Sequence, residues 1–389
     1  MFTKRLLSVV IGAFICLTSF AQVKETVADV DVHSLGLYTG MQWKTLLIYG
    51  KEEIAAGIDF PLLRMRTGYA AFMLQNYGQS LVQYKKVLDD DPTNSIALYY
   101  VYLNNLYLNN SVAARFYAGK LPAITRAAEK ITNYTLSGVN GEFSYKISND
   151  TSRRDVRYAR IGVDIQPGYR FELEQSVAFF SQNLSEPRLI NVTKNRNINN
   201  NQKEYYAKLS FAASGTVALL GGYHYIYTPF NNLVYNNNLV FAGIRYTSPF
   251  VHLKAMAALG NVTDATYRQY DLTVSVFPMG NTRLYSISRA AFGDALTFSQ
   301  VAGYRIIKNL WLEANITLGH YNNLLENDGL YVYNDIDKKQ FKAGAGMYMI
   351  FSKKGLLSFN YSFDRKLKYG TFNNYFNQHS LNTAISWKF

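Results

Sequence analysis

The C-terminal two thirds of the chain alternate between apolar and polar residues at every second position, and this period constrains the fold most. In the last eleven residues, one parity holds Leu381, Thr383, Ile385, Trp387 and Phe389, and the other parity is mostly polar. Successive side chains of a strand point to opposite faces, so such a segment has one apolar and one polar face. We therefore predict β-strands from about residue 139 onward.

The strand-like segments run for about ten residues, the length that a tilted strand needs to cross a bilayer. Short turns, such as Pro167-Gly168, alternate with longer polar connections, such as 183–202 and 321–339. This succession is typical of outer-membrane β-barrels, in which the short turns lie on the periplasmic side. We predict an antiparallel barrel of about 14 strands over residues 139–389. Counts of 12 or 16 stay open, because residues 331–333 can extend a strand above the membrane.

A soluble β-sandwich would also alternate, but it would have to bury its outward apolar rows against a second sheet. The chain holds 32 Tyr and 24 Phe but only 8 Pro. Aromatic residues gather at membrane interfaces, and proline interrupts strand ladders, so this composition favours the barrel. We interpret Trp387 and Phe389 as a terminal signal for barrel assembly in the outer membrane of a Gram-negative cell.

The first 21 residues have the pattern of a secretory signal peptide. Lys4 and Arg5 precede a short apolar core, and Ser19-Phe20-Ala21 supplies small residues where a signal peptidase cuts. The only cysteine, Cys16, lies inside this segment, so we expect a mature chain without disulfides or cysteine chemistry. Residues 22–44 form an N-terminal segment for which we predict no fold.

Residues 45–135 carry apolar side chains at three- and four-residue spacing, which predicts helices in the periplasm. The pattern Gly68, Ser80, Tyr84, Val87 and Pro92 resembles a tetratricopeptide repeat, a helix pair of about 34 residues with small and aromatic packing positions and a closing proline. The fold class is therefore α plus transmembrane β: a short helical repeat domain followed by a barrel.

The net charge is +13, but Lys and Arg are spread singly along the chain. An exported chain without a basic block is an improbable nucleic-acid partner. We find no phosphate loop, no histidine pair at metal-binding spacing and no catalytic motif, so we expect no cofactor, no metal and no enzyme activity. A hydrolase triad in the barrel wall stays open, because isolated lumen histidines such as His224 and His252 do not exclude one.

The inward faces of the predicted strands carry mixed charges, which are the candidate lumen-lining residues. They are Arg160, Asp164, Arg170, Glu172, Glu174, Lys208, Arg245, Lys254, Asp271, Glu313, Lys342 and Asp364. Opposite charges can pair across a lumen and support it, or they can line a water path. The sequence leaves both alternatives open. Residues 191–202, rich in asparagine, are predicted to be a flexible external loop.

Repeat helices in front of an outer-membrane barrel resemble two groups: the YaiO-like barrel family and the exopolysaccharide export barrels. The resemblance implies a barrel that passes or exports a hydrophilic solute or polysaccharide. An alternative is a non-conducting anchor whose helices dock a periplasmic protein. Both would need outer-membrane lipids and the barrel assembly machinery as partners. The chain has room for about two or three repeats, fewer than export barrels usually carry.

Overall fold

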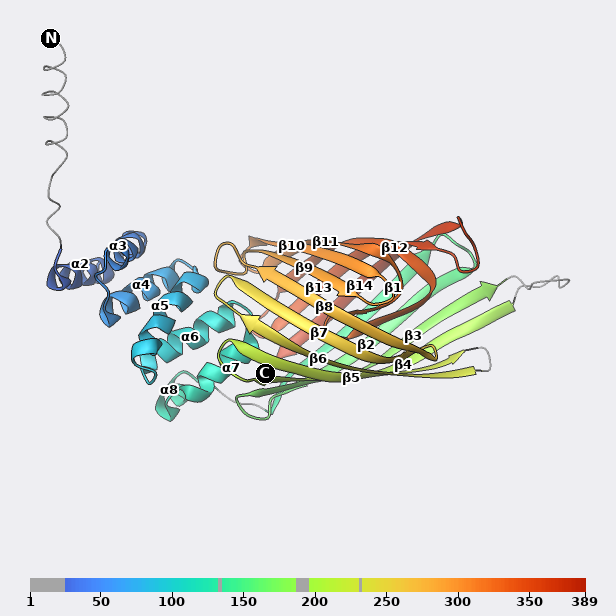
Figure 1. The fold of residues 1–389 in the computed structure, drawn as a ribbon, viewed down its shortest axis with the longest axis horizontal. Helices are drawn as coiled ribbons and strands as arrows, with labels where there is room; N and C mark the ends of the chain where they lie inside the picture. The colour runs from blue at the N-terminus through green and yellow to red at the C-terminus, as the bar shows by residue number, and fades with distance from the viewer. Residues whose placement is uncertain (1–24, 132–134, 187–195, 231–232) are drawn as a thin grey trace, which may run out of the picture.

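A computed structural model describes residues 25–131, 135–186, 196–230 and 233–389 of the chain. It shows helices followed by a closed antiparallel barrel of 14 strands (Figure 1), which confirms the predicted fold class and strand number. The predicted signal peptide, residues 1–21, lies outside the described residues.

Seven helices are present in the described part of the N-terminal region. They are α2 (Val27–Thr39), α3 (Trp43–Ala55), α4 (Pro61–Met73), α5 (Tyr77–Asp90), α6 (Ser95–Tyr107), α7 (Ser111–Lys120) and α8 (Ala123–Ala128). The helical region thus begins at Val27, well before the predicted boundary at residue 45. Thr26 and Asp29 form a capping box at the start of α2, which satisfies backbone donors of its first turn. None of the described helices is both long and apolar enough to cross a membrane.

Consecutive helices pack on each other through the residues that gave the repeat-like pattern. A Cβ on Gly68 of α4 would lie 2.9 Å from the Tyr84 ring of α5, so glycine permits this close approach. Ser80 accepts a hydrogen bond of 2.9 Å from Asn104 of α6. Tyr84 and Val87 belong to the core of the helices, and Pro92 lies in the exposed turn after α5. The assignment to tetratricopeptide repeats stays a prediction.

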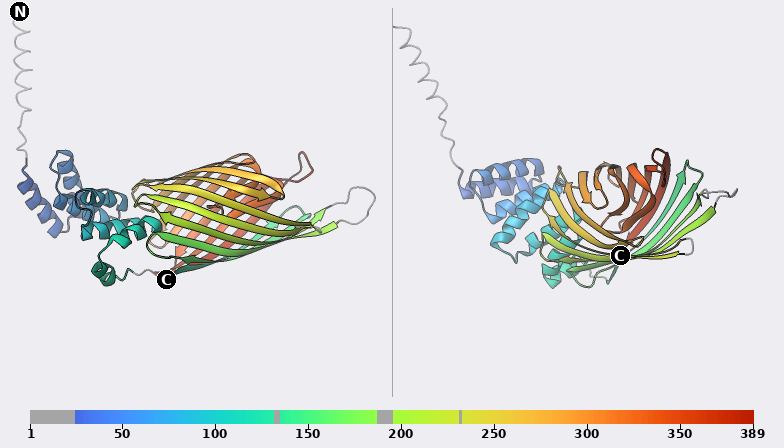
Figure 2. Two further views of the ribbon diagram at one scale, coloured as in Figure 1. Left: turned by 60° about the horizontal axis from the view of Figure 1, so that its bottom comes forward. Right: turned by 45° about the vertical axis from the view of Figure 1, so that its right-hand side comes forward.

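Each strand of the barrel is paired with its two neighbours in the ring, and β1 pairs with β14 to close it (Figure 2). The first seven strands are β1 (Leu136–Ser148), β2 (Arg153–Ile165), β3 (Phe171–Glu186), β4 (Arg196–Ala212), β5 (Val217–Phe230), β6 (Leu233–Thr247) and β7 (Val251–Val262). The others are β8 (Ala265–Val276), β9 (Leu284–Phe292), β10 (Leu296–Ile307), β11 (Leu310–Glu326), β12 (Tyr331–Ile350), β13 (Gly355–Leu367) and β14 (Tyr375–Lys388). Closure leaves no free strand edge, as a hydrocarbon environment requires.

The outer surface of the barrel carries the apolar parity of the strands. On β13, Phe359 is 40% exposed on the outside, whereas its neighbour Asn360 faces the interior cavity. The alternation is less regular on β9 and β10. There Gln300 bonds Ser286 and Ser288 on the outer face, and Ile287 and Val301 point inward.

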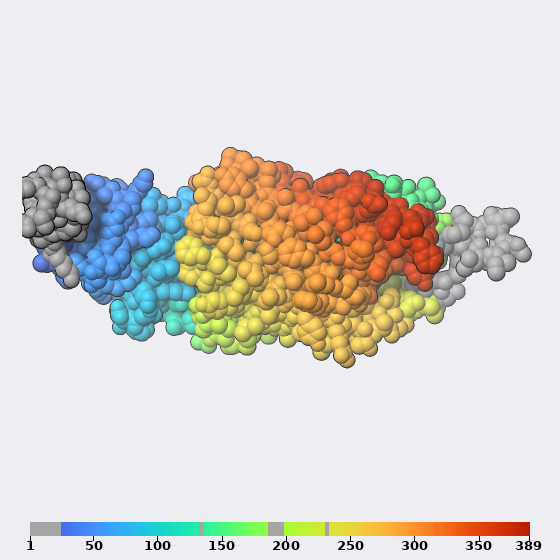
Figure 3. Space-filling view, turned by 45° about the horizontal axis from the view of Figure 1, so that its top comes forward, coloured from blue at the N-terminus to red at the C-terminus, as the bar shows by residue number. Residues whose placement is uncertain are grey.

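The helices adjoin one end of the barrel (Figures 1 and 3), and the short turns lie at this end (Figure 1). The Gly78 N–H donates to the Gly280 carbonyl at 2.8 Å, and Val112 of α7 packs on Ala212 and Ala218. Arg115 of α7 forms an ion pair of 2.7 Å with Glu172 of β3. The two parts of the molecule are therefore in direct contact through backbone, apolar and charged groups.

The opposite end of the barrel differs from the prediction in one respect. Residues 196–202, predicted as part of a flexible loop, belong to β4 and pair with residues 180–186 of β3. Asparagine disfavours strands, but the ladder between the two long strands outweighs that local preference. The rest of the predicted loop, up to residue 195, lies outside the described residues.

Candidate functional site

The hairpin formed by the ends of β11 and β12 folds into the lumen of the barrel. Its ladder runs from the pair Asn323 and Asn334 to the pair Glu326 and Tyr331, and Asp328 in its turn is buried. The expectation that residues 321–339 form an external connection is therefore wrong, and the alternative left open for residues 331–333, a strand that extends above the membrane, is not the one observed. The reason is that the apolar and acidic side chains of this hairpin find matching partners on the inner wall.

The apolar side chains of the hairpin pack against an apolar cluster on the inner wall. Leu325, Leu330 and Val332 of the hairpin contribute to this contact. The wall supplies Tyr206, Leu220, Leu239, Phe241, Met256, Ala258, Val262 and Tyr267, from β4 to β8. In the ring, β4 and β5 stand opposite β11 and β12. The hairpin thus crosses the lumen from one wall to the other.

The turn of the hairpin is held by charged and hydrogen-bonding groups. The Asp328 carboxylate lies 3.3 Å from Lys208 Nζ and 3.2 Å from Arg245 Nη2, and it also contacts Lys254 Nζ. The Tyr206 hydroxyl donates to the Asp328 carbonyl at 3.0 Å. Three strands of the wall therefore converge on a single carboxylate.

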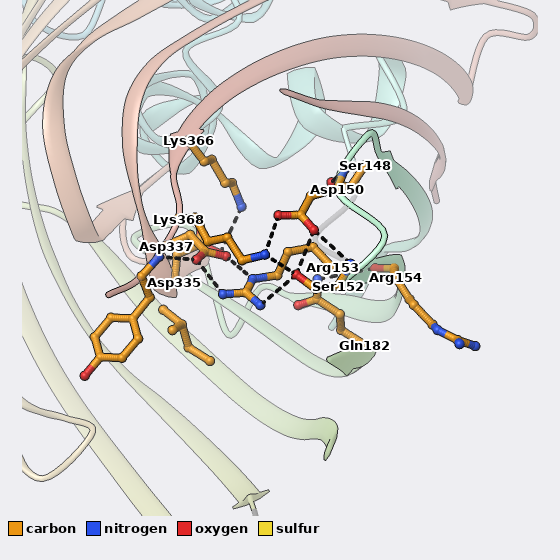
Figure 4. A network of polar contacts seen from close by, with 12 residues as sticks. Ser148, Asp150, Ser152, Arg153, Arg154, Gln182, Asp335, Asp337, Lys366 and Lys368 are labelled. Atoms are coloured by element: carbon orange, nitrogen blue, oxygen red, sulfur yellow. Dashed lines mark hydrogen bonds and ion pairs between the residues drawn. The ribbon is translucent and has the colours of Figure 1, made fainter. Parts of the chain in front are cut away.

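The other acids of the hairpin also form ion pairs. Glu326 lies 3.1 Å from Lys342, and Asp335 lies 3.1 Å from Lys366. Asp337 forms a bidentate pair with Arg153, with N–O distances of 2.6 and 2.8 Å (Figure 4). Because such fork-like pairs restrict both partners, they fix the base of the hairpin in one geometry.

A cavity of about 750 Å³ remains around the hairpin. Much of its wall on β1, β13 and β14 consists of neutral polar side chains: Ser144, Asn360, Ser362, Gln378, Ser380 and Asn382. At the helical end, Asn109 and Asn110 from the turn between α6 and α7 also line it. The lumen is therefore partly filled, polar side chains border its cavity on this side, and the helical region contributes to its boundary.

Most of the candidate residues predicted from the sequence lie in pairs. Arg160 bonds Glu142 at 3.0 Å, Lys208 bonds Glu174 at 2.8 Å, and Asp364 lies 3.6 Å from Lys339. Asp271 pairs with Arg289, and Glu313 accepts a bond from Tyr285. Glu172 bonds Arg115 of α7, as described above, and Arg170 lies over the Phe116 ring of the same helix. Asp164 is half-buried next to Gly138.

The structure brings Lys208, Arg245 and Lys254 together at Asp328, and places Lys342 at Glu326. Sequence reasoning missed the acids of the hairpin. A signal was present, since residues 326–337 contain four acids and no Lys or Arg. An acidic segment of this kind complements the basic side chains on the inner wall.

Both inward histidines lie inside the barrel. His224 is fully buried, with Nδ1 at 2.7 Å from the Gly329 carbonyl and Nε2 at 3.4 Å from Glu204. His252 borders the cavity. Among the described residues, no group of three or more His, Cys, Asp or Glu side chains could hold a metal ion.

Neither a protein-family model nor a curated protein matches the chain. The relationship to the YaiO-like family therefore stays a prediction. Among solved structures, the chain is similar to the toluene transporter TodX of Pseudomonas putida, with 9% identity and a TM-score of 0.44, over 73% of this chain and 93% of TodX.

Two further structures are similar at this level. A bacterial polysaccharide outer membrane secretin has 8% identity and a TM-score of 0.41, over 66% of this chain and 99% of the secretin. The Acinetobacter baumannii outer membrane protein Omp33 has 8% identity and a TM-score of 0.40, over 66% of this chain and 99% of Omp33.

The geometry of this chain itself, a closed 14-strand ring with an apolar outer face, is that of an outer-membrane β-barrel.

Proposed function

We propose that the protein is a gated outer-membrane channel that passes or exports a hydrophilic solute or polysaccharide, with the inward hairpin as its gate. One observation supports this proposal above others: the hairpin occupies part of the lumen, and three cations of the wall meet at the carboxylate of its turn. Between Leu318 and Lys338, the chain forms strand pairs only within the hairpin itself and none with β10 or β13. The hairpin can therefore leave the lumen without breaking the strand pairing of the ring.

The orientation follows from the turns. Short turns of outer-membrane barrels face the periplasm, so we place the helical region there and the β11–β12 hairpin at the outer end. A solute would then pass between the periplasm and the cell exterior through the cavity. Amide and hydroxyl side chains on β1, β13 and β14 offer hydrogen bonds to such a solute.

Hairpin shortening tests the gate. Replacing residues 324–333 by Asn-Gly between the paired Asn323 and Asn334 removes the turn and keeps the register, because Asn-Gly favours two-residue hairpin turns. We expect stable single-channel currents in planar bilayers from this variant and rare openings from the wild type. Replacing residues 370–373 by Asn-Gly shortens another loop at the same end and should leave the channel closed.

A second function is favoured by the same plug. If the hairpin never leaves, the barrel is a non-conducting anchor, and its helices would dock a periplasmic protein. A wild type that never opens, although the folded shortened variant conducts, would support the anchor and contradict the channel; heat-modifiable gel mobility shows that both proteins are folded. Under either function we propose no catalytic role, and we propose that the barrel assembly machinery inserts the protein.

A further inference from the structure

We infer that Lys208, Arg245 and Lys254 form an anion-binding site in the lumen, which Asp328 occupies while the hairpin is in place. The inference rests on the proposed channel function and names the class of its solute, a molecule that carries carboxylate or phosphate groups. In this view the hairpin turn takes the place of the solute.

The first argument is the convergence of cations. Lys208 comes from β4, Arg245 from β6 and Lys254 from β7, and all three reach the carboxylate of Asp328. The Asp328 side chain is only 6% exposed. Charge-assisted hydrogen bonds are stronger than neutral ones, and three of them on two oxygens form a specific carboxylate cradle.

The second argument is charge balance. Glu174 bonds Lys208 at 2.8 Å and would stay behind when the hairpin leaves. Within the described part of the chain, Asp328 is the one acid that forms ion pairs with Arg245 and Lys254. Departure of the hairpin would therefore leave three cations facing one carboxylate. Because a hollow lined by clustered cations attracts anions, the vacated site favours a replacement anion.

The third argument is the polarity of the remaining contacts. The Tyr206 hydroxyl donates to the Asp328 carbonyl. A carbonyl oxygen can only accept, so the close contact of 2.7 Å between His224 Nδ1 and the Gly329 carbonyl requires a hydrogen on Nδ1. Five wall side chains thus present donors to the turn. This surface suits a ligand with several acceptor oxygens, as in a carboxylate or a phosphate.

Anion binding can be measured without any current. We would titrate citrate by calorimetry into two refolded proteins, the wild type and the variant in which Asn-Gly replaces residues 324–333. We expect this variant to bind citrate roughly tenfold or more tightly than the wild type, whose site is occupied. Inorganic phosphate should bind the same site, and glucose, which has no charge, should not.

Substitutions at the site locate the binding. In the shortened variant, combining Arg245→Gln with Lys254→Gln should weaken citrate binding by roughly tenfold or more. Arg289→Gln is the matched control, because Arg289 is a lumen cation whose partner Asp271 stays in place. Equal citrate affinity in the shortened variant and in the double substitution would overturn the inference, and so would equal loss in the control.

The intact hairpin offers a second variant. Asp328→Asn removes the charge of the turn and keeps its size, so citrate should bind more tightly than to the wild type. Unchanged affinity would contradict the inference even if the shortened variant does not fold. A folded shortened variant that binds citrate but carries no current would contradict the proposed channel function and support the anion-binding site. A conducting variant without anion preference in its reversal potential would refute the site and leave the channel.

Discussion

Two walls of the lumen face each other across the hairpin, and they are built from different side chains. The inner wall of β5 to β7 carries Leu220, Ile226, Leu239, Phe241 and Met256, all of them buried. The wall of β13, β14 and β1 carries asparagine, glutamine, serine and charged side chains, and it lines the cavity.

This difference shows that inward-facing residues of a barrel carry information about what fills its lumen. Outward apolar residues are expected of any strand in lipid, so they do not distinguish one strand from another. Apolar residues that point inward need cover from another part of the protein, because water fills an open lumen. On the inner faces of β5 to β7, apolar residues lie beside Arg245 and Lys254, and the hairpin covers both kinds of side chain.

The largest effect is expected from a charge under the hairpin. Leu239 is fully buried on β6, and an aspartate there would lose the apolar contact and bury an unpaired carboxylate. Leu239→Asp should lower the free energy of unfolding by on the order of 3–5 kcal/mol. Ser380→Asp, on the opposite wall and directly across from Lys146, should cost less, because its carboxylate would border the cavity and face an ammonium group. Urea unfolding in lipid vesicles measures both, and equal losses would show that the two walls are covered alike.

The next effect separates the lumen from the lipid on a single strand. Phe359 and Asn360 are adjacent on β13, so they lie at nearly the same depth and differ in the face they occupy. Phe359→Arg should cost about 2–4 kcal/mol near the bilayer midplane, whereas Asn360→Arg points into the cavity and should be tolerated. Refolding yield, read from unheated gel mobility, measures the difference. A greater loss at Asn360 would mean that the cavity wall is not on this face.

The smallest effect concerns how firmly the hairpin is held. Val332 and Ile336 both border the cavity, and of the two it is Val332 that also packs on the apolar cluster. Val332→Ala removes about 1 kcal/mol of apolar contact and should raise the open probability roughly fivefold. Ile336→Ala removes more side chain but should change the open probability less. Single-channel recording compares them, and the reverse order would place the hairpin contact on the other wall.

The strands could be predicted because lipid outside and polar groups inside impose a period of two on the sequence. The interior position of the hairpin could not be predicted from that period. Tyr331, Val332 and Tyr333 alternate in the same way whether the strand rises above the membrane or returns into the lumen. Partners more than a hundred residues away, such as Tyr206 and Lys208 at Asp328, decide between the two.

The candidate site could be predicted in part, because the period of two also shows which side chains face the lumen. The inward parity identified Lys208, Arg245 and Lys254 as facing the lumen, because each lies between apolar outward neighbours. Their convergence depends on strand stagger and on the hairpin, which a single sequence does not specify. The start of the helices at Val27 was missed, although Thr26 and Asp29 carry a readable capping signal.

The hairpin is tethered at one end of the barrel and held at the other. Its pairing with β10 stops at Leu318 and with β13 at Lys338, at the end away from the helices, whereas Arg245 and Lys254 lie close to the short turn between β6 and β7. In the proposed orientation, a load pressing from the periplasm would swing the turn outward about its tether. A load from outside would press it toward the helices. The hairpin would then act as a one-way valve, which opens for solutes that leave the cell and stays closed to solutes that enter it.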